Sequence, residues 1–297
     1  FFQAEDGIRD PLWSRGLGDV YKRQVRFYAE LGVKTGTGLP EIFFSKIQSG
    51  TADFVIVMED LSELTMVDQS AGMSFDQALA AVKVLANIHA VWWGKVRTEE
   101  LEWIPSMVGP RIEYVDQVLP QIYPIFAKAF ASTLPEGGVA LTEQFSRSYL
   151  SLNRQLAERA PWTLAHQDYR VENMLFGDVN RDQVVVIDWQ GIGRGPGAYD
   201  LAYLLGGSMD TGLRRAHERE LVAAYQTRLV DNGVEGYSFE RTWEDYGFAH
   251  LLGGLATSIF AGGTLDLSNE RGVELITMMA NRHVTAALDH GGFKDFH

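Results

Sequence analysis

Three polar side chains within a short stretch of the chain have the types that the transfer of a phosphoryl group requires. Asp168 is followed by Asn173, and Asp188 ends the apolar run 184–187. One carboxylate can orient an attacking hydroxyl and accept its proton, while the amide oxygen and the second carboxylate hold Mg²⁺ against the phosphates of ATP. Hard oxygen ligands suit Mg²⁺, which usually takes only one or two carboxylates from a protein. We therefore predict Asp168 as the catalytic base and Asn173 and Asp188 as metal ligands.

The elements expected to position these groups are a loop, a short strand, a turn and a second strand. The first strand follows Asn173, the turn is Gly177–Asn180, and the second strand leads to Asp188. Neither the H-x-D-x-x-x-x-N pattern nor an apolar run that ends in Asp is specific by itself. Their combination, in this order and at this separation, matches the catalytic loop and the metal-binding acid of kinases. The alternative is a hairpin whose polar residues only cap turns.

The sequence resembles a superfamily of small-molecule kinases that includes aminoglycoside phosphotransferases, choline kinases and ecdysteroid-kinase-like proteins. The resemblance is carried by His166-Gln167-Asp168-Tyr169-Arg170-Val171-Glu172-Asn173, by Ile187-Asp188-Trp189-Gln190 and by Gly197-Ala198-Tyr199-Asp200-Leu201-Ala202-Tyr203. Protein kinases have D-F-G where this chain has Asp-Trp-Gln, which resembles the small-molecule enzymes. The resemblance implies an α/β (α+β), protein-kinase-like fold with an incomplete N-lobe and a mainly helical C-lobe. It also implies ATP and Mg²⁺ as cofactors and a small-molecule hydroxyl as the acceptor.

The same resemblance assigns roles to two further groups of residues. Arg170 lies where protein kinases often carry a lysine that contacts phosphate, so it is a second catalytic candidate; a surface ion pair with Glu172 is the alternative. The apolar strand 54–59 ends on Glu59, and Asp60 and Leu61 follow it. In the superfamily this segment is the hinge whose backbone groups pair with adenine. The alternative is a simple buried strand that is followed by polar residues.

The N-terminal part of the sequence is expected to be incomplete. Residues 1–24 show neither helical nor strand periodicity, and they resemble translated sequencing-adapter sequence, so we expect a foreign segment without a folded element. The helix predicted over 25–31 resembles the one that supplies the glutamate partner of the phosphate-binding lysine. Gln24 occupies the position of that glutamate, so neither member of the pair is identified. Because kinases of this type need the pair for activity, we expect an impaired enzyme.

The expected domain boundaries follow from these assignments. Residues 25–61 are a remnant of the N-lobe with the hinge, and residues 62–297 form the C-lobe. Within the N-lobe, strands over 41–48 and 54–59 are expected to be joined by a turn at Ser49–Thr51.

Several predictions concern the elements of the C-lobe. Ser74 and Gln77 have the spacing of a capping box and start a helix, in which His89 is expected to be packed and hydrogen-bonded. The prolines between residues 105 and 135 are expected to break helical structure. One uninterrupted helix is expected over about 239–261.

The glycine-rich segment after Asp188 and the helix that follows it are also expected to support the site. Residues 191–197 are predicted to form a mobile loop. Asp200 is predicted to N-cap the next helix and to bond the catalytic loop.

The composition narrows the class of partner and the compartment. The chain has no cysteine, which excludes disulfides and thiolate metal sites, and with no recognisable signal peptide the cytoplasm is the expected location. A net charge of −13 argues against a nucleic-acid partner. A membrane span would need about 18 apolar residues in a row, and the sequence has no such run. The sequence does not reveal the oligomeric state or the identity of the phosphoryl acceptor.

Two rival interpretations remain open at this point. The chain could bind ATP or a metabolite without catalysis, as a pseudokinase or an inert fragment, because no glycine loop or paired lysine is identified. A protein kinase is a weaker rival, since Trp189-Gln190 departs from D-F-G and the chain contains no A-P-E.

Overall fold

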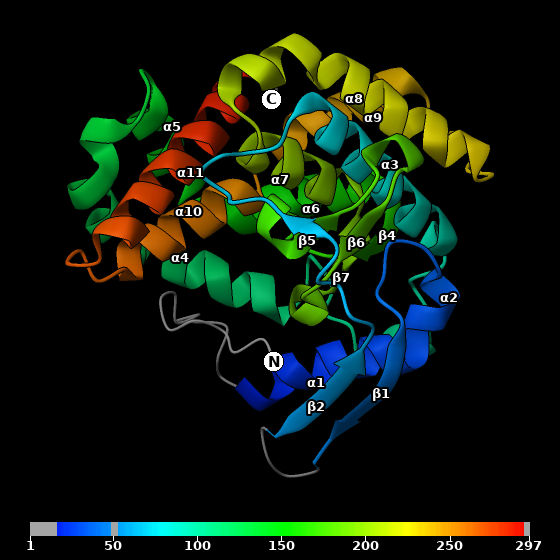
Figure 1. Cartoon of the computed structure of the whole chain (residues 1–297). Coiled ribbons are helices and arrows are strands. Elements are labelled where there is room, and N and C mark those ends of the chain that lie inside the picture. Colours follow the sequence, from blue (N-terminus) through cyan, green and yellow to red (C-terminus); the bar gives the residue numbers. More distant parts are fainter. Residues whose placement is uncertain (1–16, 49–52, 294–297) are drawn as a thin grey trace.

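The computed structural model describes residues 17–48 and 53–293. Figure 1 shows a small N-terminal part built on a ribbon of strands and a larger, mostly helical part. This arrangement confirms the mixed α+β class and the kinase-like organisation expected from the sequence. Segment 1–16 and the predicted turn Ser49–Thr51 lie outside the described residues. Along the described ranges, no helix is long and apolar enough to cross a lipid bilayer.

The smaller part packs one helix against a two-stranded antiparallel ribbon. Its elements are α1 (Leu17–Phe27), a π-helical turn (Tyr28–Gly32), α2 (Val33–Thr35), β1 (Ile42–Ile47) and β2 (Phe54–Met58). The two strands confirm the prediction, with Ser45 of β1 opposite Ile56 of β2.

Helix α1 begins earlier than the sequence indicated. The prediction of no folded element up to residue 24 is wrong for residues 17–24, which lie in α1. The C-terminal end of α1 is packed into the protein, because Val25 and Phe27, and Tyr28 directly after the helix, are buried. Helix α1 contacts both strands of the ribbon and the turn after Asp188. This tertiary packing stabilises a helix that the sequence of residues 17–24 alone does not indicate.

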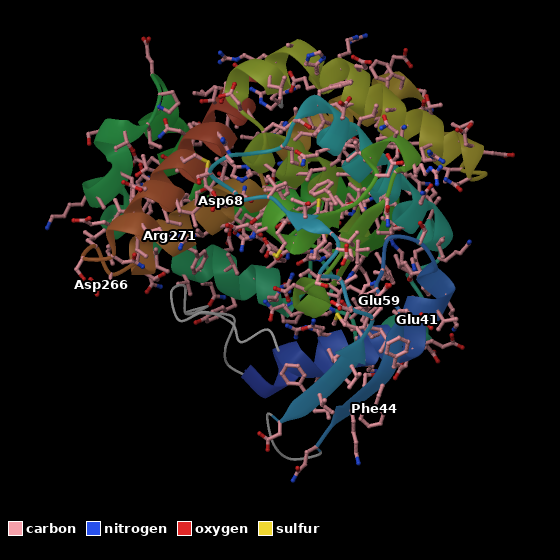
Figure 2. All side chains as sticks on the ribbon, in the orientation of Figure 1. Glu41, Phe44, Glu59, Asp68, Asp266 and Arg271 are labelled. Carbon is pink, nitrogen blue, oxygen red and sulfur yellow. The ribbon has the colours of Figure 1, made fainter. Side chains whose placement is uncertain are left out.

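The ribbon keeps much of its apolar surface in contact with solvent. Phe43 and Phe44 of β1 are 62% and 51% exposed, and Val55 and Val57 of β2 are 44% and 46% exposed. Figure 2 shows Phe44 on this ribbon. A shift of register between Ile42 and Phe44 explains why two adjacent phenylalanines are both exposed, since a bulge interrupts the alternation of faces.

The larger part contains the long helices. They are α3 (Phe75–Trp92), α4 (Pro110–Phe130), α5 (Gly138–Phe145), α6 (Tyr149–Arg159), α7 (Ala198–Ser208), α8 (Thr211–Asp231), α9 (Phe239–Ala249), α10 (Gly253–Thr264) and α11 (Glu270–Asp289). The capping box of α3 is confirmed, because the Gln77 N–H donates to Ser74 Oγ and the Ser74 N–H donates to Gln77 Oε1 at 2.9 Å.

Helix α4 overturns the prediction that prolines break this region. Pro110 takes the first position of the helix, and Pro120 and Pro124 lie inside it. Both internal prolines face solvent, so the carbonyls that they leave without an N–H partner can bind water. The opposite face of α4 packs largely against α10, and this packing outweighs the free-energy cost of the two internal prolines. Six apolar side chains are buried on this face: Ile112, Val115, Leu119, Ile122, Phe126 and Phe130.

The single helix predicted over 239–261 is also wrong. Helix α9 ends at Ala249 and α10 begins at Gly253, and Leu252 between them has φ −129° and ψ −116°, outside the helical region. A Cβ atom at Gly253 would overlap the Tyr199 side chain, so the chain needs glycine where α10 approaches α7. The break places His250 at the end of α9.

Short strands lie at the centre of the molecule. One sheet has the order β3 (Thr65–Met66), β5 (Met174–Phe176) and β6 (Val184–Val186), and a second pairs β4 (Trp162–Ala165) with β7 (Gly193–Pro196). The predicted hairpin is confirmed as β5–β6. The mobile loop expected over 191–197 is wrong, because Gly193 to Pro196 pair in register with β4 and are fixed by it.

Candidate active site

The β5–β6 hairpin brings the two acidic residues of the site together. β5 starts directly after Asn173, and β6 ends two residues before Asp188. The pairing continues past the strands, since the Ile187 N–H donates to the Asn173 carbonyl at 3.0 Å. The loop that carries Asp168 therefore lies beside the residue that precedes Asp188.

Asp168 and Asn173 are joined directly. The Asn173 side-chain amide N–H donates to the Asp168 carboxylate at 2.9 Å and to the Asp168 carbonyl at 2.8 Å. Both bonds use the amide nitrogen, so the amide oxygen is the atom that Asn173 can offer to a cation. Tyr203 of α7 also hydrogen-bonds the Asp168 carboxylate.

Arg170 neighbours both acids in its loop. Its Nε lies 3.3 Å from the Asp168 carboxylate, and its Nη1 lies 2.8 Å from the Glu172 carboxylate. The ion pair with Glu172 foreseen as the alternative is therefore present, together with a contact to Asp168. Asp168 is the main cause that raises the pKa of Arg170, so the guanidinium stays charged.

The two carboxylates have pKa values shifted in opposite directions. Burial alone would raise the pKa of Asp168, but the charges of Arg170 and His166 and the Asn173 hydrogen bond outweigh it and lower the pKa. Burial and then the neighbouring Asp168 charge raise the pKa of Asp188. Two carboxylates that repel each other in a shielded place are relieved by a divalent cation between them. Together with the free amide oxygen, this donor set fits Mg²⁺.

Asp200 holds the loop that leads into Asp168. Its carboxylate is fully buried and accepts the backbone N–H groups of His166 at 2.6 Å and of Gln167 at 2.9 Å. Gln167 has φ 67°, an unusual value for a residue with a side chain, which these two bonds maintain. The predicted bonding of the loop by Asp200 is present, but the predicted N-cap is wrong, since Gly197 occupies that position.

A histidine supports each side of this arrangement. His89 of α3 is buried and bonds the Tyr225 hydroxyl at 2.7 Å, with the Asp200 carboxylate 3.3 Å away, which confirms its predicted structural role. His166 bonds the Ile187 carbonyl through Nε2 at 2.9 Å. It thereby fixes the backbone next to Asp188, which has φ 63° and ψ 58°, a left-handed conformation that Asp tolerates better than most residues.

Helix α1 forms the other wall next to Asp188. The ring of Phe27 stacks on Trp189 with centroids 4.2 Å apart, and Arg23 Nε donates to the Gln190 carbonyl at 3.3 Å. Burial and the charge of Asp188 raise the pKa of Tyr28, which follows α1 directly. The sequence did not single out these contacts; the aromatic pair Phe27-Tyr28 within the helix predicted over 25–31 was the available signal.

The hinge candidates lie on a separate segment after β2. The Glu59 N–H donates to the Glu41 carbonyl at 2.9 Å and the Glu59 carboxylate accepts the Glu41 N–H at 2.8 Å, a pair labelled in Figure 2. The Asp60 carboxylate caps the Ser62 N–H, and the Leu61 carbonyl accepts the Leu64 N–H. Among the described hydrogen bonds, the Glu59 carbonyl and the Leu61 N–H are not used. The structure thus gathers Asp168, Arg170, Asn173 and Asp188, and Glu59, Asp60 and Leu61 take part in none of the contacts described among those four residues.

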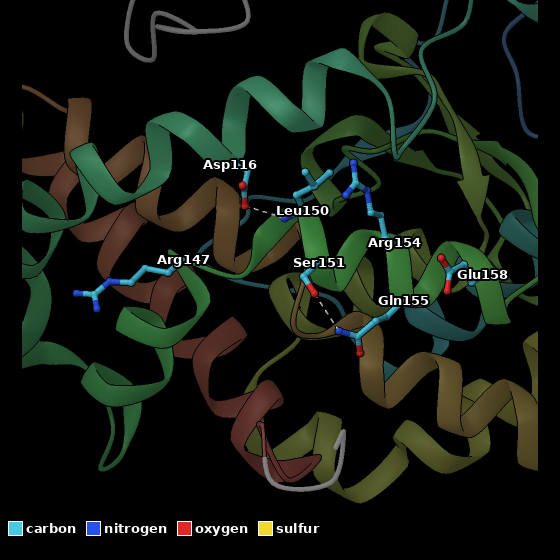
Figure 3. A pocket seen from close by; sticks show the side chains of 7 residues that line it. All are labelled: Asp116, Arg147, Leu150, Ser151, Arg154, Gln155 and Glu158. Carbon is cyan, nitrogen blue, oxygen red and sulfur yellow. Dashed lines mark hydrogen bonds between the residues drawn. The ribbon is translucent and has the colours of Figure 1, made fainter.

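A surface hollow of about 410 Å³ lies elsewhere, over α6 and its neighbours (Figure 3). Its lining is polar and mixed in charge: Asp116, Arg147, Leu150, Ser151, Arg154, Gln155 and Glu158. None of the residues gathered around Asp168 lines it, so its size alone does not mark the site of chemistry.

The fold and the grouping of Asp168 with Asn173 and Asp188 define a protein of the kinase-like class. The chain belongs to the ecdysteroid kinase-like family, whose model matches residues 19–234. No curated protein matches it in sequence.

Solved structures that share the fold include an aminoglycoside phosphotransferase and two kinases. The GDP complex of aminoglycoside 2'-phosphotransferase-IIIa is 15% identical, with 90% of this chain and 83% of that chain covered and a TM-score of 0.54. An amicoumacin kinase in complex with AMP-PNP and Ca²⁺ is 11% identical, with coverages of 90% and 78% and a TM-score of 0.55. A Plasmodium vivax ethanolamine kinase is 12% identical, with coverages of 92% and 72% and a TM-score of 0.55.

Proposed function

We propose that this protein transfers the γ-phosphoryl group of ATP to a hydroxyl group of a small molecule in the cytoplasm. The observation that carries the proposal is the Asn173 amide bonded to Asp168, with the partly buried Asp188 beside them at a pKa that Asp168 helps to raise. Membership of the ecdysteroid kinase-like family supports it, and so do the nucleotide complexes of proteins with the same fold.

Each residue has a defined part in this reaction. The Asp168 carboxylate accepts the proton of the acceptor hydroxyl as its oxygen bonds to the γ-phosphorus and the bond to the bridging oxygen breaks, so that ADP leaves with the electron pair. Asn173 and Asp188 would hold Mg²⁺, which neutralises charge on the phosphates. The charged Arg170 would contact the transferred phosphate. The Glu59 carbonyl and the Leu61 N–H offer the acceptor and donor that the edge of adenine requires.

The test compares ATP consumption by the full chain and two variants across a panel of hydroxylated amines, sugars and steroids. Asp168→Asn removes the base, and general-base catalysis is worth about 10²–10⁴-fold, so we expect a loss of at least about 100-fold. Asp178→Asn is the matched control, because Asp178 is a turn acid in the same hairpin, and its carboxylate accepts the Asn180 N–H and pairs with the exposed Arg181. Equal turnover by the wild type and Asp168→Asn would refute the role of Asp168.

Binding of nucleotide without turnover is the second candidate function. It is favoured by Gln24, which stands in α1 where the resembled kinases carry the glutamate of the Lys–Glu pair. Calorimetry with Mg·ATP separates the two functions. Binding with no turnover by the wild type supports a non-catalytic binder, and no binding at all rejects both.

A further inference from the structure

A second group of metal-binding side chains lies in the helical part, apart from the residues around Asp168. Glu218 lies in α8, His250 follows the last residue of α9, and His290 follows the last residue of α11. One ligand atom of each lies within 4.8 Å of the other two. His290 Nε2 lies 3.3 Å from Glu218 Oε2.

His250 is the member that most needs an explanation. Its side chain is 3% exposed, and within the described part of the chain both of its ring nitrogens are buried without a hydrogen-bond partner. Burying a polar group without a partner costs free energy, so native proteins satisfy nearly all such groups with protein, water or an ion. The ring of His250 lies against that of His290, with centroids 5.1 Å apart, so an ion bound by His290 would be within reach of His250.

Burial and neighbouring groups shift the pKa values of His250 and Glu218 in the directions that favour metal binding. Burial, and then the neighbouring His290 and Arg214, lower the pKa of His250 well below its usual value, so the imidazole is neutral with a free lone pair. Burial would raise the pKa of Glu218, but the His290 hydrogen bond and the charge of Arg214 outweigh it and lower the pKa. A neutral imidazole and an ionised carboxylate are the ligating forms.

Groups from α8, from α9 and from the end of α11 already contact Glu218. Arg214 contacts Glu218 and Asp289, and Arg215 also pairs with Asp289, so two arginines face two acids. Tyr246 donates its hydroxyl to the same Glu218 oxygen at 3.0 Å. These contacts use Oε2, and within the described part of the chain Oε1 accepts no hydrogen bond, so an ion would be bound through Oε1.

We propose that Glu218, His250 and His290 bind one Zn²⁺ ion with water in the fourth position. Zinc–nitrogen and zinc–oxygen bonds of about 2.0–2.2 Å place tetrahedral ligands about 3.3–3.5 Å apart, and ligand atoms of the three side chains already lie within 4.8 Å of one another. The side chains of Glu218 and His290 are 12% and 10% exposed, which gives an ion access from solvent. The ion would join α8 to the ends of α9 and α11 and act as a structural clamp, separate from the oxygen-lined Mg²⁺ site.

The experiment uses the full chain without an affinity tag, stripped with EDTA and then titrated with Zn²⁺ or Co²⁺. We expect one Zn²⁺ per chain by mass spectrometry of the metal, strong visible absorption bands of tetrahedral Co²⁺, and a rise in Tm of about 5 °C on saturation. Mg²⁺ at the same concentration should produce none of these changes, because it prefers oxygen ligands.

Two variants and one control connect the binding to these residues. Removal of a partner in the outer shell already costs about 10–100-fold in metal affinity, so His250→Leu and Glu218→Gln should each cost at least about 100-fold. His250→Leu should leave the stability of the metal-free protein almost unchanged, since His250 has no hydrogen bond to lose. His217→Ala, on the same helix as Glu218 and outside the cluster, should bind as the wild type does.

Two results would overturn the proposal. One is a folded wild type that shows no tetrahedral Co²⁺ spectrum and no stoichiometric Zn²⁺ at micromolar concentration. The other is equal Zn²⁺ affinity in the wild type and both variants. The wild-type measurement decides the question even where a variant fails to fold, and it does not depend on kinase activity.

Discussion

Replacing Asp200 by Asn is the sharpest test of how the loop before Asp168 is held. Each oxygen of the buried carboxylate accepts one backbone N–H, from His166 at 2.6 Å and from Gln167 at 2.9 Å. An amide keeps one oxygen and turns an N–H group towards the other donor. The variant therefore loses one charge-assisted bond and gains a donor–donor clash.

The size of the effect follows from these two changes. A hydrogen bond to a charged group contributes about 1.5–3 kcal/mol, and an unsatisfied buried donor costs about 1–3 kcal/mol, so Asp200→Asn should destabilise by about 3–5 kcal/mol. Urea unfolding followed by circular dichroism measures this directly. Because Gln167 is kept at φ 67° by the same carboxylate, affinity for Mg·ATP should fall as well.

The matched control is Asp210→Ala. Asp210 is the N-cap of α8 and accepts the N–H groups of Gly212 and Leu213 at 2.8 and 3.2 Å. Loss of an exposed N-cap costs about 1 kcal/mol and should leave nucleotide affinity unchanged. The reasoning is refuted if Asp200→Asn is no more destabilising than Asp210→Ala, because the buried carboxylate would then act as an ordinary cap.

Three further predictions concern the site and the docking of α1. Asn173→Ala should raise the Mg²⁺ concentration required for half-maximal nucleotide binding by about tenfold, equal to about 1.4 kcal/mol, and an unchanged Mg²⁺ titration would remove Asn173 from the metal site. The pKa of Asp188 is raised and that of Asp168 is lowered, so Asp188 is protonated first as the pH falls. Mg²⁺ affinity should therefore fall as the pH drops through the pKa of Asp188, before Asp168 is protonated. In Asp188→Asn this part of the pH dependence should vanish. Calorimetry at several pH values measures it, and the same slope of Mg²⁺ affinity against pH in the wild type and the variant would contradict the assignment of Asp188 as a metal ligand. Phe27→Ala should destabilise by about 3–5 kcal/mol, since the ring is fully buried, whereas Phe43→Ala, 62% exposed, should change stability by less than about 0.5 kcal/mol. Similar Tm values for these two variants would show that α1 does not depend on its stacking contact.

Local patterns in the sequence were enough to predict that Asp168, Asn173 and Asp188 lie close together. Asp168, Asn173 and Asp188 belong to one hairpin, so the distance between them along the chain already limits how far apart they can lie. The two strands of the ribbon and the capping box of α3 were predicted for the same reason, because a turn or a cap is specified by a few adjacent residues.

The features that the sequence did not reveal depend on contacts between distant segments. Helix α1 extends back to Leu17 because its far end is buried, and α4 continues through Pro120 and Pro124 because its other face packs against α10. The break at Gly253 follows from the approach of α10 to Tyr199. The Glu218 and His290 pair is separated by 72 positions, and no local pattern records that they meet.

The exposed ribbon of β1 and β2 has a practical consequence for anyone who purifies this protein. The edges of this two-stranded sheet offer backbone hydrogen-bonding groups next to exposed apolar side chains: Phe43, Phe44, Val55 and Val57. Exposed edges of this kind pair readily with strands of other molecules. Concentrated stocks should therefore form oligomers through this ribbon, and Phe44→Lys should keep the protein monomeric without changing Asp168, Asn173 or Asp188.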